Sequence, residues 1–128
     1  REALRRLERI VHPAVAESRR IFLRRFRSRP LIVLDIPLLF EKKGWRQVDA
    51  IVVVSAPAWK QARRVLARPN MNPLKLRHIR SLQVPDHVKR ARADFVIENG
   101  GSIDRTRARI RHLITCLRAH GVRYCRHA

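Results

Sequence analysis

The stretch Leu31-Ile-Val-Leu-Asp35-Ile-Pro-Leu-Leu-Phe40-Glu41 decides the fold. Its branched apolar residues predict a strand over residues 31–36, and the run ends in one carboxylate before a proline turn. A buried parallel strand delivers an acid to the rim of a nucleotide site in this way. The stretch therefore raises the question of where a phosphate-binding loop would lie.

Two further apolar runs predict strands over residues 49–55 and 94–97. The runs at 31–36 and 49–55 are too continuous in apolar residues for a strand with one wet face, so we expect helices to cover both faces. Asp86 and Ser102 are predicted N-caps. The strands alternate with helical patterns, which favours an α/β fold with an open parallel sheet and helices on both faces. The predicted helices span residues 57–68, 73–82, 87–93 and 103–118.

The start of the chain has apolar residues at helical spacing. They predict one helix over residues 3–12, interrupted by Pro13 after His12, and a second over residues 15–26. The length of 128 residues suits a single domain. We expect that domain to span the chain, with a tail over residues 119–128.

The charge of the chain is strongly positive, because 30 Lys and Arg outnumber 10 Asp and Glu to give a net +20. Such a surface attracts polyanions without specificity. No uninterrupted apolar run is long enough for a membrane helix, and no signal-peptide pattern opens the sequence, which favours the cytosol. In that reducing compartment Cys116 and Cys125 are expected to be free thiols. Residue 1 is arginine and the only methionine is Met71, which predicts a trimmed or truncated start.

The carboxyl ends of the predicted parallel strands lie at one edge of the sheet, which brings Asp35, Ser55 and Asn99 to the same side. A carboxylate in the position of Asp35 can hold Mg²⁺, usually through water, beside a bound triphosphate. The same position also fits a strand-terminal aspartate that accepts hydrogen bonds from the following turn.

Arginines and glycines supply two further candidate groups. Arg64 and Arg68 are four residues apart, so they share a helix face with Arg63 nearby and could contact phosphoryl oxygens, although a solvated face explains the same pattern. The sequence Asn99-Gly100-Gly101 lets the backbone approach a ligand closely, and an asparagine amide matches a purine edge. A plain strand-to-helix turn explains the same residues and is the favoured interpretation from these residues alone.

The last predicted helix and the residues after it carry side chains of the types that bind zinc. The residues His112, Cys116 and His120 follow one another at intervals of four, with Cys125 and His127 beyond. These are zinc-capable types, but the paired C-x-x-C pattern of structural zinc sites is absent and Cys116 lies near the apolar stripe. The pattern favours a structural role.

The glycines of the chain exclude a phosphate-binding loop of the Walker type within this sequence. A Walker loop, G-x-x-x-x-G-K-[ST], cannot be built from the four glycines of this chain, which are Gly44, Gly100, Gly101 and Gly121. A sequence with an acid for magnesium, arginines for phosphates and a loop for adenine, but without the phosphate loop, is typical of the later part of a phosphotransferase.

With these residues placed, the chain resembles the dephospho-coenzyme A kinase family from its middle to its C-terminus. The matching segments occur in the family's order and cover nearly the whole chain. They are Leu7-Glu-Arg-Ile-Val-His12-Pro13, Val33-Leu-Asp35-Ile-Pro37-Leu-Leu-Phe40-Glu41, residues 48–49 through Val54-Ser55-Ala-Pro57, Gln61-Ala-Arg-Arg64 with Arg68, and Ala93-Asp94-Phe-Val-Ile97-Glu-Asn99-Gly100-Gly101-Ser102.

The resemblance implies a P-loop kinase fold and transfer of the γ-phosphate of ATP to the ribose 3′-hydroxyl of dephospho-coenzyme A, the last step of coenzyme A synthesis. It also implies a mobile lid over residues 69–85 that excludes water. By the same resemblance Asp35 lies near Mg²⁺ and the phosphates, and Arg64 and Arg68 contact the ATP phosphates. Asn99 and Gly100 lie near the adenine. The acceptor side is formed by His12, Pro37, Leu38, Leu39, Phe40 and Glu41.

The chain departs from the family in one respect that matters for activity. The family's Walker loop and its early aspartate, the expected general base, are not in this sequence. Phosphoryl transfer depends on positioning and electrostatic stabilisation by that loop, its lysine and the metal together. We therefore expect the 128 residues alone to lack useful kinase activity.

Two other functions compete with this interpretation. The net +20 fits an arginine-rich module that binds nucleic acid without specificity, although no recognised nucleic-acid motif is present. Another P-loop kinase of small metabolites would share the sheet and the arginines.

Overall fold

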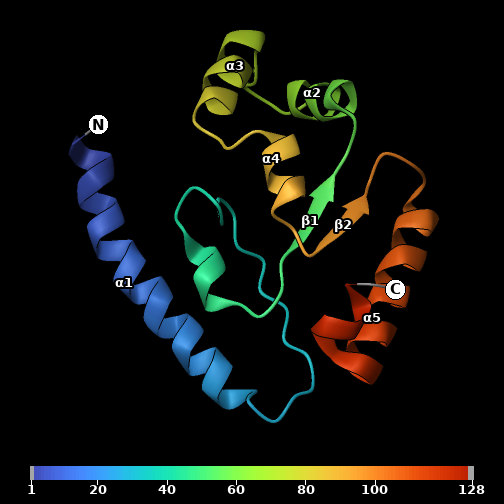
Figure 1. Ribbon diagram of the computed structural model, residues 1–128. Coiled ribbons are helices and arrows are strands. Elements are labelled where there is room, and N and C mark those ends of the chain that lie inside the picture. Colours follow the sequence, from blue (N-terminus) through green and yellow to red (C-terminus); the bar gives the residue numbers. More distant parts are fainter. Residues whose placement is uncertain (1, 127–128) are drawn as a thin grey trace. The chain divides into compact units, whose positions relative to one another are not determined.

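The computed structural model describes residues 2–126, apart from the side chains of Ala3 and Leu4 (Figure 1). The chain divides into two compact units, residues 1–34 and residues 35–128. Among the described residues, no helix has the length and apolar character needed to cross a membrane.

The first unit is dominated by one helix, α1, which spans Glu2–Arg25 and continues through Pro13. The predicted break after His12 is therefore wrong. Proline removes one hydrogen bond to the preceding turn and its ring crowds the carbonyl four residues earlier, at a cost of roughly 3 kcal/mol. The turns on both sides are rich in alanine, leucine, glutamate and arginine, which favour helix and carry it through. The second predicted helix is the C-terminal half of α1.

Residues 31–36 adopt no regular secondary structure, so the strand predicted there is wrong for this chain. Branched apolar residues favour an extended backbone, but a strand also needs a neighbour that accepts and donates backbone hydrogen bonds. Within the described part of the chain these residues take part in no such ladder.

The second unit contains a parallel sheet of two strands, β1 (Val52–Ser55) and β2 (Phe95–Glu98), drawn side by side in Figure 1. Val52 pairs with Phe95 and Ser55 with Glu98. Both strands coincide with predicted ones, and the α/β class with a parallel sheet is confirmed.

Only one face of β1 is covered. Val53 is 8% exposed, whereas Val52 and Val54 are 44% and 59% exposed. The prediction that helices cover both faces is wrong for this strand among the described residues, because the contacting helix α4 (Asp86–Ala91) leaves the Val52 and Val54 side open. The core is correspondingly small, and its buried apolar residues are Phe40, Val53, Ala56, Ile97 and Cys125.

Three helices lie between the strands: α2 (Ala58–Leu66), α3 (Pro73–Ser81) and α4. A short 3₁₀ helix, η1 (Gly44–Gln47), precedes β1. The three helices begin and end within about two residues of the predicted bounds, which is the usual uncertainty of helix ends. Asp86 does not act as the predicted N-cap. Its carboxylate instead accepts a hydrogen bond from Ser55 Oγ at 2.7 Å, and Pro85 precedes the helix.

The last helix, α5, spans Ile103–Cys125 and begins at Ser102 as predicted, since Ser102 Oγ accepts a hydrogen bond from Arg105 N at 3.3 Å. It extends beyond the predicted end near Arg118, into the residues expected to form a tail. The helix is interrupted at Gly121, where φ is +74°, a left-handed backbone that glycine adopts without steric cost.

The change of direction at Gly121 returns the chain toward α5 and brings Cys125 to Cys116. Their Cα atoms are 6.0 Å apart and the two sulfurs form a disulfide, so the prediction of two free thiols is wrong. The next residue, Arg126, forms an ion pair of 2.5 Å with Asp94, and Asp94 accepts a hydrogen bond from Ile51 N at 2.7 Å. The end of α5 is thus bonded to the beginning of both strands.

Candidate functional site

The carboxyl ends of β1 and β2 bring two loops into contact, as the parallel topology predicts. Asn99 N donates to Ser55 O at 2.6 Å, which continues the pairing one residue beyond the strands. Ser55 is only 3% exposed, and its hydroxyl donates a hydrogen bond to Asp86. The hydroxyl of Ser55 is therefore not presented to a ligand at the surface. The nucleotide site predicted from the sequence lies at this edge of the sheet.

Asp35 is exposed, and no hydrogen bond or ion pair joins its carboxylate to another described residue. Mg²⁺ usually keeps several waters and binds through one or two carboxylates together with substrate phosphates. A single uncommitted carboxylate fits that pattern. The described residues contain no group of three or more histidines, cysteines, aspartates and glutamates that could form a closed metal cage.

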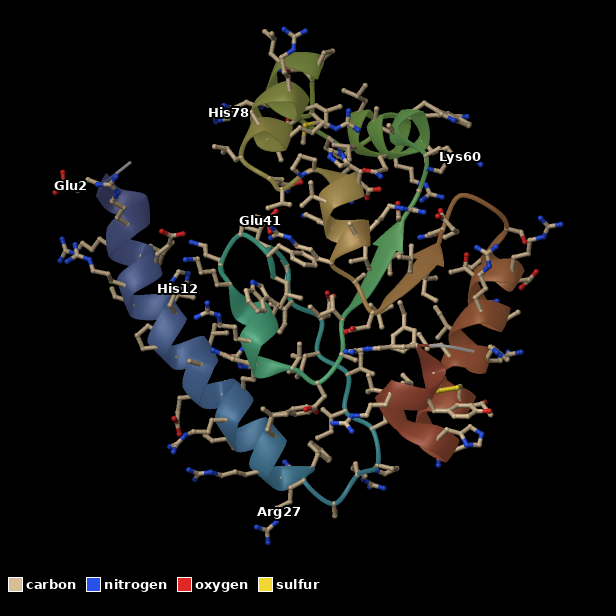
Figure 2. All side chains as sticks on the ribbon, viewed as in Figure 1. Glu2, His12, Arg27, Glu41, Lys60 and His78 are labelled. Atoms are coloured by element: carbon tan, nitrogen blue, oxygen red, sulfur yellow. A yellow bond between two sulfur atoms is a disulfide. The ribbon has the colours of Figure 1, made fainter. Side chains whose placement is uncertain are left out.

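Glu41 has the opposite surroundings, because its side chain is only 12% exposed. Glu41 Oε1 accepts hydrogen bonds from Lys89 Nζ at 2.9 Å and from Val84 N at 2.8 Å. Glu41 Oε2 is buried without a hydrogen-bond partner among the described residues. Figure 2 labels Glu41 on the loop that precedes η1, beside α4.

The pKa of Glu41 reflects these contacts. Burial raises the pKa, but the hydrogen bond from Lys89, the backbone N–H groups of Glu41 and Val84, and the charge of Lys89 together outweigh burial and lower it. Through its bonds to Val84 and Lys89, Glu41 connects the predicted acceptor segment to the end of the predicted lid and to α4.

The other residues predicted for the acceptor side divide between surface and core. Pro37 and Leu38 are exposed, Leu39 is half-buried, and Phe40 is 8% exposed. Leu38 has a φ of +58°, a left-handed conformation that costs a non-glycine residue roughly 1–2 kcal/mol. Phe40 is thus a core residue here, while Pro37 and Leu38 remain accessible to a ligand. His12 lies on α1 in the first unit, and its role stays a prediction.

The two predicted phosphate arginines differ in their partners. Arg64 Nη2 donates to Asn99 O at 3.0 Å. Arg68, which follows α2, has an exposed side chain without a hydrogen bond or ion pair to the described residues. Asn99 and Gly100 lie together at the end of β2, and the side-chain amide of Asn99 likewise has no described partner.

The structure also brings together residues that the sequence did not single out for the site. A hollow of about 360 Å³ at the carboxyl end of β1 is lined mainly by residues of α2, of α4 and of the segment between α3 and α4. Two of its polar side chains are bonded to backbone carbonyls: Gln61 Nε2 donates to Ala56 O at 2.7 Å and Arg80 Nη2 to Ala58 O at 3.2 Å. Only the pairing of α2 with the later segment reveals this hollow, and no local pattern encodes that pairing. The lining residues are Ala56, Ala58, Gln61, Arg80, Gln83, Val84, Pro85, Asp86 and Lys89.

The residues weighed for zinc do not form a metal site within the described part of the chain. Cys116 and Cys125 are joined to each other. His120 packs against Tyr124, with ring centroids 4.5 Å apart. His127 lies outside the described residues.

Comparison with known structures defines the class. The chain resembles the crystal structure of TT1252 from Thermus thermophilus with a TM-score of 0.71 and 34% sequence identity, covering 91% of this chain and 60% of that one. The fold is that of a P-loop-kinase-like α/β protein.

A family model described as dephospho-CoA kinase matches residues 1–105. The chain therefore belongs to the dephospho-CoA kinase family, which confirms the resemblance seen in the sequence.

Two curated relatives agree with this assignment, and both are named dephospho-CoA kinase. The protein of Zymomonas mobilis is 51% identical over 122 residues, which is 95% of this chain and 62% of that protein. The protein of Novosphingobium aromaticivorans is 54% identical over 117 residues, which is 91% of this chain and 58% of that protein. The chain thus spans about six tenths of the length of these relatives.

Proposed function

We propose that the full-length product of the gene carrying this sequence transfers the γ-phosphate of ATP to the ribose 3′-hydroxyl of dephospho-coenzyme A. The observation that carries the proposal is the family match over residues 1–105. Because the chain spans only part of its relatives' length, the activity is proposed for the full-length protein. Its expected location is the cytosol.

In the proposed reaction Asp35 holds Mg²⁺ through water at the phosphate side. Bound Mg²⁺ neutralises charge on the β- and γ-phosphates of ATP. The uncommitted carboxylate of Asp35 supports this role, since nothing else in the described chain competes for it. Arg68 supplies a second uncommitted charge, a guanidinium that spreads the charge of the transferring phosphoryl group.

Dephospho-coenzyme A is proposed to bind against residues 37–41. A role of His12 in binding the acceptor is proposed separately, since His12 belongs to the first unit. Pro37 and Leu38 present exposed apolar surface for the acceptor, while Phe40 and Glu41 hold this loop in place from inside the chain. Residues 69–85 close over the reacting groups and exclude water, which would otherwise accept the phosphoryl group. Asn99 and Gly100 lie at the adenine.

The 128 residues alone are proposed to lack useful activity, because none of their four glycines belongs to a Walker loop. The test is an assay of coenzyme A formation from ATP, Mg²⁺ and dephospho-coenzyme A with two purified proteins, the full-length gene product and the 128-residue chain. We expect turnover by a gene product that contains a Walker loop and no turnover by the 128 residues.

The same assay distinguishes a kinase of another small metabolite. Adenosine, pantetheine phosphate and shikimate would replace dephospho-coenzyme A in parallel reactions. Faster phosphorylation of any of these acceptors by the full-length protein would contradict the proposal. Normal turnover by the 128-residue chain would contradict the expectation that it is inactive. Nucleic-acid binding, the other competing function, gains no support from the family match.

A further inference from the structure

The loop that follows β2 is bonded to α2 by two positive charges. Lys60 Nζ donates a hydrogen bond to Gly100 O, and Arg64 Nη2 donates to Asn99 O at 3.0 Å. Lys60 and Arg64 are four residues apart on α2, so they extend from the same face of the helix. Figure 2 shows Lys60 on the side of α2 nearest this loop. Two neighbouring residues of one face therefore bind two consecutive carbonyl groups.

The backbone of the loop is also fixed from the side of β1. Asn99 N donates to Ser55 O at 2.6 Å. A Cβ atom on Gly100 would lie 2.7 Å from Pro57 Cδ, closer than real Cβ contacts, so the loop lies directly against Pro57. The position of residues 99–100 is thus set by a ladder bond, a close backbone approach and two charged donors.

Lys60 is not a solvated surface lysine. Its side chain is half-buried and its Nζ lies 5.2 Å from the ring centroid of Trp59. Holding a four-carbon side chain in one geometry costs conformational entropy, which a charge-assisted hydrogen bond and the aromatic contact offset. The lysine thus contributes to the shape of the loop.

Lys60 and Arg64 bind only the backbone of the loop and leave the side-chain amide of Asn99 available. The carbonyls of Asn99 and Gly100 are bonded to α2, and the N–H of Asn99 is bonded to Ser55. The side-chain amide of Asn99 has no hydrogen-bond partner among the described residues. A preformed loop with one available amide suits a ligand with a flat hydrogen-bonding edge, because the backbone of the loop needs no further ordering on binding.

We propose that Lys60 is a positioning residue for the ATP base, acting with Arg64 through the backbone of Asn99 and Gly100. The inference rests on the proposed function, since it takes ATP as the nucleotide. It gives Arg64 a role on the base side instead of the phosphate side that its spacing with Arg68 indicates. It also makes the first turns of α2, which lead into the predicted lid, part of the nucleotide site.

The test compares the dissociation constants for ATP and for dephospho-coenzyme A, measured by calorimetry on the full-length gene product. Lys60→Met keeps most of the apolar side chain and removes the charge. We expect a dissociation constant for ATP about tenfold higher, the effect of losing one charged hydrogen bond. We expect the constant for dephospho-coenzyme A to stay unchanged and Lys60→Arg to restore most of the ATP affinity.

The matched control is Arg107→Met, which removes one charge from the exposed side of α5, where Arg107 pairs with Asp104 at 3.5 Å and with no other described residue. It should bind both ligands as the wild type does. Gly100→Ala is the second variant: it displaces the loop from Pro57 without changing any charge, and it too should weaken ATP alone.

Three results would overturn the inference: ATP binding that is unchanged in Lys60→Met and Gly100→Ala, equal weakening of both ligands, or a wild type that does not bind ATP. Failure of the proposed function looks different. In that case the wild type binds ATP but forms no coenzyme A, and the effect of Lys60→Met on ATP affinity still decides the role of the lysine.

Discussion

Asp35 and Glu41 belong to one short segment, but their surroundings are opposite. Asp35 is exposed and has no partner among the described residues, whereas Glu41 is 12% exposed and bonded to Lys89 and Val84. Two carboxylates of the same family motif are therefore available for different tasks. Asp35 can act on a ligand, and Glu41 acts on the fold.

The arginines of the α2 region show the same division. The side chain of Arg64 is bonded to the backbone of Asn99, while the side chain of Arg68 has no partner among the described residues. The expectation that both contact phosphates treated them as equivalent because they share a helix face. Arg64 thus helps to position the loop after β2, whereas a contact between Arg68 and a ligand stays a prediction.

The largest effect is expected for Asp35→Asn in the full-length protein. Loss of the charge should lower the rate of coenzyme A formation by about a hundredfold, in the range seen when one electrostatic group of an active site is removed. The melting temperature should stay unchanged, because Asp35 bonds to no described residue. Steady-state kinetics and thermal unfolding of the same preparation give both values.

The control for this variant is Asp104→Asn, which removes a carboxylate that is 84% exposed in the first turn of α5. It should keep the wild-type rate. A rate for Asp35→Asn within about threefold of the wild-type rate lies far from the expected range. This result would contradict a role of Asp35 in the reaction.

Glu41→Gln should instead reduce stability. The amide can still accept from Val84 N, but the half-buried Lys89 loses its counter-charge. We expect the free energy of unfolding to fall by about 2 kcal/mol, typical of a hydrogen bond to a charged group. Urea unfolding of the full-length protein measures the change.

The exposed pair of Glu17 and Arg20 on α1 provides the matched control. Their Oε1 and Nη2 atoms are 2.7 Å apart, but both side chains are more than half exposed, so Glu17→Gln should have little effect. Equal losses in Glu17→Gln and Glu41→Gln would show that burial does not distinguish the two carboxylates.

A smaller effect separates Arg68 from Arg64. Arg68→Met should lower kcat about tenfold with little change in the KM for ATP, because a guanidinium that acts on the transferring phosphoryl group contributes mainly in the transition state. Arg64→Met should raise the KM for ATP with little change in kcat. The same pattern in both variants would mean that the two arginines share one role.

The smallest effect concerns pH. The pKa of Glu41 is lowered in the folded protein, so its charged form stabilises the fold. This stability is present above the unfolded pKa, about 4.3, and is lost as pH falls through the lower folded pKa. Urea unfolding from pH 6 to pH 3 should therefore show a shallower loss for Glu41→Gln than for the wild type. Parallel curves would contradict the assigned cause.

The sequence predicted the class of fold and most helix and strand positions, because those follow from local patterns. Val52–Ser55 formed its strand, since β2 supplies a neighbour, whereas the similar run at residues 31–36 did not. Pairing is a non-local property, and branched residues alone do not specify it. The same limit explains the open face at Val52 and Val54.

The sequence predicted which residues belong to the candidate site, but not the hydrogen bonds that hold them in place. Asn99 and Gly100 follow β2, as the predicted strand end requires, whereas Asp35 follows no strand, and the roles of all three toward a ligand stay predictions. Neither the bond from Lys60 to Gly100 nor that from Glu41 to Val84 could be predicted, since each joins residues about forty positions apart through tertiary packing. The disulfide was missed because it depends on the left-handed turn at Gly121.

The dependence of coenzyme A formation on Mg²⁺ tests most directly whether Asp35 is left free for a ligand. The rate would be titrated with Mg²⁺ at saturating ATP and dephospho-coenzyme A, for the full-length wild type and Asp35→Asn. The account predicts a half-saturating Mg²⁺ concentration about tenfold higher in the variant, the equivalent of about 1.4 kcal/mol. Superimposable Mg²⁺ curves would contradict it.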